Sequence, residues 1–130
     1  MKKILVIAPH ADDEVLGLGG YLLDESRKGS AIYIIYGAVG GEDGRQNATT
    51  RELEIMDVVR CLNATYRVLF YGKDAELDMV PSRSIISAID KEIDEYRPDE
   101  VFINCTSHHQ DHKKLYECAM AVPVSHTALI

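Results

Sequence analysis

The stretch APHADDEVLGLGG (residues 8–20) directly follows a short apolar run, KILVIA (3–8), close to the start of the chain. The apolar run predicts a buried β-strand, and the residues behind it predict a helix that ends at Gly29. His10 and three consecutive acids, Asp12 to Glu14, therefore follow the carboxyl end of a strand. Because packed acids repel one another and resist desolvation, this cluster requires a compensating positive charge.

The helix itself is one source of that charge. Its N-terminus carries partial positive charge, so Asp12 would cap the helix, Glu14 would add to an acidic first turn, and His10 would have no special role. A bound cation is the alternative source, and the rest of the sequence bears on the choice.

Strands and helices alternate along the remainder of the chain. Further strands are predicted at 31–38, 66–72 and 100–105, and helices at 50–62, 82–96 and 111–121. This order predicts an α/β fold, a Rossmann-like doubly wound parallel sheet with helices on both faces. The core-facing residues are predicted from helical spacing as Leu53, Met56, Val59 and Leu62 in one helix and Ile85, Ile86, Ile89 and Ile93 in the next.

A second polar cluster follows the fourth predicted strand. The segment SHHQDHKK (107–114) holds three of the chain's five histidines, so that four of the five lie in two short segments. Ligands of open α/β sheets bind at the carboxyl ends of strands, where the strand order reverses. If both clusters serve one site, strands one and four are neighbours and the sheet order is 3-2-1-4.

Imidazole and carboxylate together are ligands typical of Zn²⁺. His10 and Asp13 are three residues apart across a strand-to-helix turn and can face one ion, and a histidine of the second cluster would complete the set. Asp12 would then take a proton from an attacking water molecule. The remaining histidine would stabilise an oxyanion or protonate a leaving nitrogen, and Asp111 would orient it.

The two segments resemble the motifs of the LmbE-like, or PIG-L, family of zinc-dependent deacetylases, which act on N-acetylglucosamine-type sugars. PHADDEVLGLGG (9–20) and HQDH (109–112) match the family's two motifs, and the resemblance extends over residues 2 to 122. It implies zinc ligation by His10, Asp13 and His112. It further implies that Asp12 is the general base, that His109 stabilises the oxyanion or protonates the amine, and that Asp111 supports His109.

Two weaker similarities suggest contacts with the substrate. RELE (51–54) resembles the family's Arg-x-x-Glu, which makes Arg51 a candidate sugar contact, with an ion pair to Glu54 as the alternative. YGKDAELDMVP (71–81) resembles the family's loop after the third strand and makes Asp74 a second candidate. Gly19 and Gly20 are expected to permit close helix packing.

Composition limits the remaining possibilities. A net charge of −7 argues against a nucleic-acid partner, and no apolar run approaches the length of a membrane span. Three scattered cysteines indicate packed, reduced thiols and a cytoplasmic protein. We expect a single domain, 1–130, that is C-terminally short for the family and forms homo-oligomers through exposed sheet edge or apolar surface.

Two other functions remain open on sequence grounds. A short chain of this family would serve as a metal- or sugar-binding module without catalysis. A nucleotide-binding module is suggested by GLGG (17–20), although these glycines do not fit Gly-x-Gly-x-x-Gly and lie inside the predicted helix.

Overall fold

A computed structural model describes residues 1–10, 13–39, 45–71, 77–103, 110–122 and 128–129, and within these ranges not the side chains of 13–17, 39, 45–50, 71, 78, 128 and 129. The elements along the chain are β1 (Lys3–Ala8), α1 (Asp13–Arg27), β2 (Ala31–Val39), α2 (Arg45–Leu62), β3 (Thr65–Tyr71), the 3₁₀ turn η1 (Leu77–Met79), α3 (Ser82–Tyr96), β4 (Glu100–Ile103), α4 (Gln110–Ala121) and β5 (Ala128–Leu129). The predicted alternation of strand and helix is confirmed.

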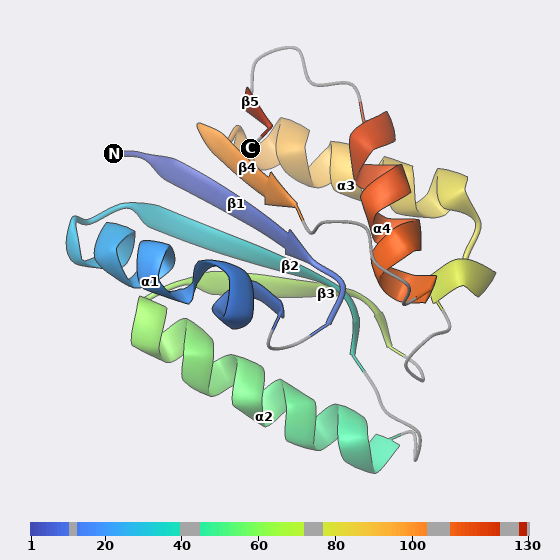
Figure 1. Ribbon diagram of the computed structural model, residues 1–130, viewed down its shortest axis with the longest axis horizontal. Helices are drawn as coiled ribbons and strands as arrows, with labels where there is room; N and C mark the ends of the chain where they lie inside the picture. The colour runs from blue at the N-terminus through green and yellow to red at the C-terminus, as the bar shows by residue number, and fades with distance from the viewer. Residues whose placement is uncertain (11–12, 40–44, 72–76, 104–109, 123–127, 130) are drawn as a thin grey trace.

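The strands form one parallel sheet in the order β3-β2-β1-β4-β5 (Figure 1). The predicted order 3-2-1-4 is confirmed, with β1 between β2 and β4. The short strand β5 was not predicted from the sequence and adds to the edge of β4, where Glu100 is paired with Ala128.

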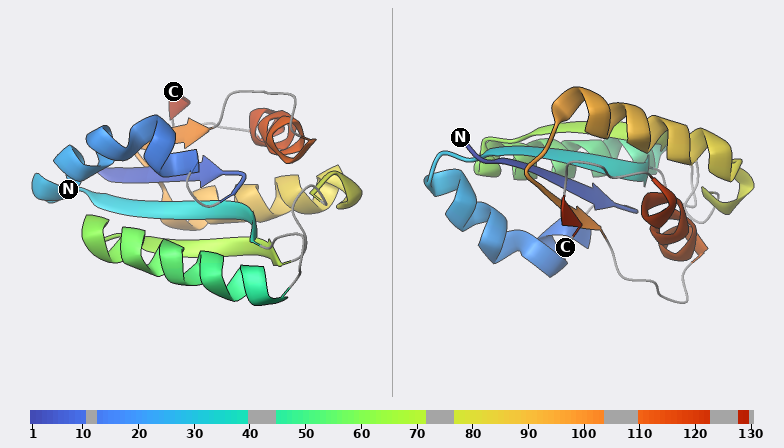
Figure 2. Two further views of the ribbon diagram at one scale, coloured as in Figure 1. Left: turned by 60° about the horizontal axis from the view of Figure 1, so that its bottom comes forward. Right: turned by 90° about the horizontal axis from the view of Figure 1, so that it is seen from above.

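Side chains of β1 alternate between two hydrophobic cores, as the twofold repeat of a strand requires. Ile4, Val6 and Ala8 pack with residues of α1 and α2 on one face. Leu5 and Ile7 pack with α3, α4 and η1 on the other face. Figure 2 shows the sheet with helices on both of its faces. Since β1 is covered on both sides, an apolar residue at every position from Ile4 to Ala8 satisfies both cores.

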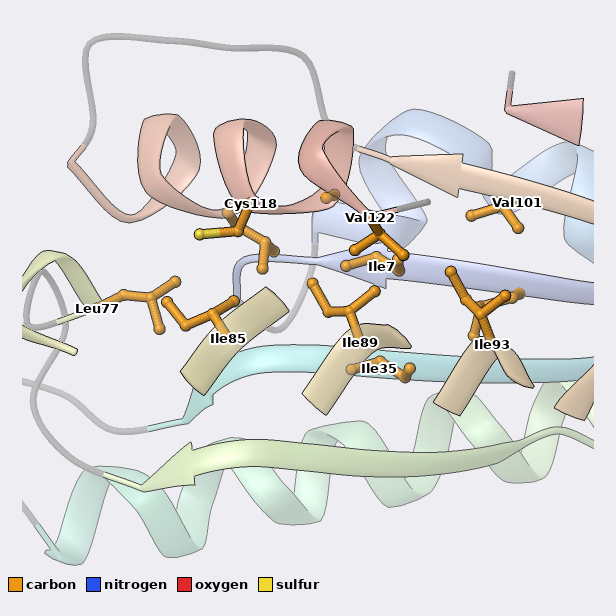
Figure 3. Close-up of a cluster of buried hydrophobic side chains, with 12 residues drawn as sticks. Ile7, Ile35, Leu77, Ile85, Ile89, Ile93, Val101, Cys118 and Val122 are labelled. Atoms are coloured by element: carbon orange, nitrogen blue, oxygen red, sulfur yellow. The ribbon is translucent and has the colours of Figure 1, made fainter. Parts of the chain in front are cut away.

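The core of the second face contains a row of isoleucines from α3. Ile85, Ile89 and Ile93 point from this helix toward Ile7 of β1 and Val122 after α4 (Figure 3). The apolar face predicted for this helix is confirmed, with Ile86 packed at its margin.

The apolar face predicted for α2 was partly wrong. Leu53 is 59% exposed and Met56 is 42% exposed, whereas Ile55 is buried and Leu62 lies beside it in the core. One apolar stripe runs from Leu53 through Met56 and another begins at Ile55, and both end at Val59 and Leu62. Packing of the helix against β2 and β3 decides which of the two stripes is buried. The helix also begins five residues earlier than predicted, at Arg45.

Two predictions about glycines, a helix end at Gly29 and close helix packing at Gly20, had different outcomes. The first helix ends at Arg27, and Gly29 has φ of +90°, a conformation that glycine adopts without strain and that commonly follows a helix. At Gly20, by contrast, an added Cβ would meet no described atom within 4 Å. Close packing at Gly20 was therefore a wrong expectation.

Cysteine packing was predicted correctly for one of the two described thiols. Cys118 is buried in the second core, and its burial raises the pKa of the thiol. Cys61, near the end of α2, is exposed. Cys105 lies outside the described residues. Among the helices that the structure describes, none is long and apolar enough to cross a membrane.

Candidate functional site

The candidate site lies at the carboxyl end of β1 and β4, where the chain turns to opposite faces of the sheet. The two strands are paired in parallel up to Ile7 and Ile103. After β1 the chain enters α1 on one face, and after β4 it enters α4 on the other (Figure 1). This topology brings His10, just beyond β1, close to Asp111 in the first turn of α4. The carboxyl ends of neighbouring strands are the place where open α/β sheets bind ligands.

A buried hydrogen bond connects the two motifs. The His10 imidazole donates from Nε2 to Oδ2 of Asp111 over 2.6 Å, across 101 residues of sequence. Asp111 is fully buried and His10 nearly so, so water competes little for either group. A charge-assisted bond of this length in a buried place fixes both the rotation of the ring and the nitrogen that carries the proton.

Further groups stabilise the Asp111 carboxylate. Its Oδ1 accepts a hydrogen bond of 2.9 Å from the backbone N–H of Leu77, in the η1 turn. Asp111 also lies in the first turn of α4, where the helix dipole favours negative charge. The carboxylate thus has a partner on each oxygen, which a fully buried charge requires.

His112 completes the described part of the site. Its ring centroid lies 5.5 Å from that of His10, with the rings tilted by 52°. Two imidazoles that bind one zinc ion at about 2.0–2.1 Å have ring centroids about 5 Å apart, so the observed spacing is near that of a shared ion. His112 is only half-buried, which leaves this side of the site accessible.

The donor chemistry also fits a metal ion. Asp111 accepts a hydrogen bond from Nε2–H of His10, so in the neutral ring Nδ1 is the nitrogen that carries the lone pair, the form in which imidazole binds a metal ion. Among the side chains that the structure describes, no three histidines, cysteines or acids form a complete ion-binding group. The third expected ligand, Asp13, is the first residue of α1, and its side chain is outside the described part.

Several predicted site residues lie beyond the described ranges. Asp12, His109 and Asp74 are in this group. Arg51 is half-buried in the first half of α2, the helix that begins beyond the carboxyl end of β2 (Figure 1). Of the predicted site residues whose side chains the structure describes, it brings together His10, Asp111 and His112.

Sequence reasoning missed two features of this site. Asp111 was predicted to orient His109, and the structure shows its carboxylate against His10. The amide of Leu77 was not predicted at all, because a backbone donor in an irregular turn has no residue-type signal. The apolar character of Leu77, after a polar stretch of sequence, was the available indication that this residue is buried.

Comparisons with known proteins agree with the motifs. A sequence model of the PIG-L family, described as GlcNAc-PI de-N-acetylase, matches residues 5–122. No curated protein matches the sequence.

Solved structures share the fold. N,N'-diacetylchitobiose deacetylase from Pyrococcus horikoshii is 28% identical with a TM-score of 0.78, and the match covers 92% of this chain and 48% of that chain. The conserved protein TT1542 from Thermus thermophilus is 30% identical with a TM-score of 0.72, covering 93% of this chain and 55% of that one.

A hydratase has the same fold. GalB, the 4-carboxy-2-hydroxymuconate hydratase from Pseudomonas putida KT2440, is 17% identical with a TM-score of 0.76, covering 92% of this chain and 55% of that one. Fold alone therefore does not specify the reaction. The present chain spans about half the length of these three proteins. With a family match over residues 5–122, both motifs in place and the sheet order confirmed, the chain belongs to the PIG-L (LmbE-like) family.

Proposed function

We propose that this chain carries the active site of a metal-dependent hydrolase that removes an acetyl or other N-acyl group from an N-acetylglucosamine-type sugar or related amine. The observation that supports this most directly is the arrangement of His10 and His112, whose ring centroids are 5.5 Å apart while Asp111 holds the first ring. Membership of the family adds the deacetylase chemistry.

Zn²⁺ is the metal we propose, held by His10, Asp13 and His112. Two imidazoles and a carboxylate are a ligand set that catalytic zinc sites use, although other divalent transition metals accept the same donors. A metal in this position supplies Lewis-acid chemistry, which polarises the amide carbonyl and lowers the pKa of the attacking water.

The proton transfers are assigned to residues of the two motifs. Asp12 takes a proton from the water as its oxygen attacks the acyl carbon. His109 stabilises the oxyanion or gives a proton to the nitrogen as the carbon–nitrogen bond breaks. The reaction consumes one water molecule and releases a carboxylate, acetate for an acetyl group, together with a free amine.

Asp111 has a positioning role in this proposal. Because its Oδ2 accepts a hydrogen bond from Nε2–H, Asp111 holds the rotation of the His10 ring and keeps the proton on Nε2. A carboxylate in this place also makes the imidazole a more basic ligand. Arg51 and Asp74 are proposed as substrate contacts, Arg51 through the hydroxyl or acyl oxygens of a sugar.

The direct test measures metal content together with amine release. We expect one metal ion per chain, and release of free amine from acetylated glucosamine derivatives, with N,N'-diacetylchitobiose included because of the Pyrococcus structure. A chelator should stop the reaction, and Zn²⁺ or Co²⁺ should restore it. Glucosamine without an acyl group serves as the control and should give no increase in free amine.

Other outcomes separate the alternatives. Stoichiometric metal without amine release from any acetamido sugar or N-acyl amine would favour a binding module that lacks catalysis. Addition of water to the double bond of an unsaturated carboxylic acid, without amine release, would favour a hydratase. The Pseudomonas protein with the same fold is named as an enzyme of this kind. Dinucleotide binding that a chelator leaves unchanged would favour the nucleotide-binding alternative.

A further inference from the structure

Gly37 lies in β2 near the carboxyl end of the sheet, and three neighbours surround the place where a side chain would begin. A Cβ at Gly37 would come within 3.3 Å of Leu77 Cδ2, 3.3 Å of the Pro9 carbonyl oxygen and 3.4 Å of Leu115 Cδ2. Contacts this short are tighter than ordinary van der Waals packing, so an added methyl group would displace at least one neighbour.

Each of these neighbours is connected to one of the two residues of the hydrogen bond between His10 and Asp111. Pro9 precedes His10 in the chain, and its carbonyl oxygen accepts a hydrogen bond of 3.0 Å from Ala38, the residue after Gly37. Leu77 donates its backbone N–H to Asp111.

Leu115 is the third neighbour, and it lies one helical turn after Asp111 in α4. Its side chain is fully buried in the same core as that of Leu77. The end of β1, the η1 turn and the first turns of α4 therefore all meet above Gly37.

We infer that Gly37 is a positioning residue for the metal ligand His10, and that the missing side chain at this place sets the distance between His10 and Asp111. The consequence for metal binding rests on the proposed function, whereas the hydrogen bond itself does not. Pro9 is the neighbour least able to adjust, because its oxygen is part of the backbone and is hydrogen-bonded to β2. Movement of Leu77 would in turn carry the amide that holds Asp111.

The test substitutes Gly37→Ala and follows two quantities. The first is the Nε2–H resonance of the His10 imidazole in metal-free protein, assigned with a His10→Gln variant. This proton should shift upfield or broaden by exchange, because its bond to Asp111 is lengthened. The second is Zn²⁺ affinity by calorimetry, which should fall about ten-fold or more, as for other losses of support behind a ligand.

Gly20→Ala is the matched control. It makes the same change at a glycine where the new Cβ meets no described atom within 4 Å. Both the His10 resonance and the zinc affinity should stay at their wild-type values.

A second pair of variants separates positioning from loss of core packing. Leu77→Val and Ile89→Val each alter a fully buried side chain of the same core. Figure 3 shows Leu77 at one end of the cluster, on η1, and Ile89 on α3. Both should lower the melting temperature by a few degrees. Only Leu77→Val should move the His10 resonance, and this pair gives a result even if Gly37→Ala does not fold.

An unchanged His10 resonance in folded Gly37→Ala, or equal shifts in Leu77→Val and Ile89→Val, would overturn the inference. If the wild-type chain binds no metal and Gly37→Ala still moves the resonance, the positioning role stands and the proposed function fails. If the wild-type chain binds zinc and releases amine, and Gly37→Ala binds zinc equally well, the proposed function stands and the positioning role fails.

Discussion

The two ends of strands β1 and β4 carry polar clusters of different construction. At the amino end, the Lys2 ammonium lies 3.3 Å from Glu25 and 3.1 Å from Glu100, and Tyr21 donates a 2.6 Å hydrogen bond to Glu100. At the carboxyl end, the buried pair is His10 and Asp111. The chain supplies a permanent cation, Lys2, among the acids at the amino end, and an imidazole with a carboxylate at the carboxyl end.

The ionisation of the amino-end cluster follows from these contacts. A hydrogen bond to Glu100 raises the pKa of both Lys2 and Tyr21. Hydrogen bonds from Ser30 and then Lys2 lower the pKa of Glu25. Lys2 therefore stays protonated, Tyr21 neutral and Glu25 ionised. Their mutual contacts connect the start of β1 with α1 and β4. The comparison indicates that one end stabilises the fold and the other suits a bound cation.

The largest expected effect is on turnover at the carboxyl end. Asp12→Ala should lower the rate of amine release by about 10²–10⁴-fold, because general base catalysis contributes that much. Metal content should stay at the wild-type level, since Asp12 is not a proposed ligand. Parallel measurements of amine release and bound metal check this, and undiminished turnover would show that Asp12 is not the base.

The next effect contrasts the two ends directly. Asp111→Asn retains an oxygen for the Leu77 amide and loses the acceptor for His10, so Zn²⁺ affinity should fall by about 10–100-fold. Glu25→Gln, at the amino end, should leave the affinity unchanged. Calorimetric titration of both variants tests the contrast, which fails if the two variants lose affinity equally.

A smaller effect concerns stability at the amino end. Tyr21→Phe removes the hydrogen bond to Glu100 and one partner of Lys2, and should lower the free energy of unfolding by about 1 kcal/mol. Urea denaturation measures the change. Zinc affinity should be the same as in the wild type, and a weaker affinity would show that the two ends are coupled through the sheet.

The smallest effect is a pH dependence from Glu25. Since its pKa is lower in the folded than in the unfolded chain, its ionised form stabilises the fold above the ordinary value of 4.5. That contribution is lost as the pH falls through the lowered folded value. Urea denaturation at pH 6 and at pH 3 should therefore show a gap in stability between wild type and Glu25→Gln that narrows in acid.

Glu54→Gln serves as the control for the acid titration, because Glu54 is an exposed acid on α2. It should differ little from the wild type at either pH. A gap for Glu25→Gln that persists in acid would show that the side chain acts through packing and not through its charge.

Much of the fold was predictable because the hydrophobic pattern within each segment indicates its secondary structure. The apolar run of β1 indicates a strand covered on both faces, and the isoleucines of α3 recur at helical spacing, so each segment specifies its own structure. The neighbouring position of β1 and β4 was also predictable, since it was inferred from a chemical requirement, that two polar motifs share one ligand. The face of α2 was not, because Leu53 and Ile55 lie on competing stripes of similar hydrophobicity.

The sequence by itself determined the order of strands and helices, the family, and the two motifs that would meet at one edge of the sheet. Only the tertiary structure decided that Asp111 contacts His10, that Leu77 offers its amide to the same carboxylate, and that Gly37 lies beneath them. The physical reason is distance along the chain. Periodicity and residue type describe segments a few turns long, whereas a bond between His10 and Asp111 spans 101 residues and depends on the packing of every element between them.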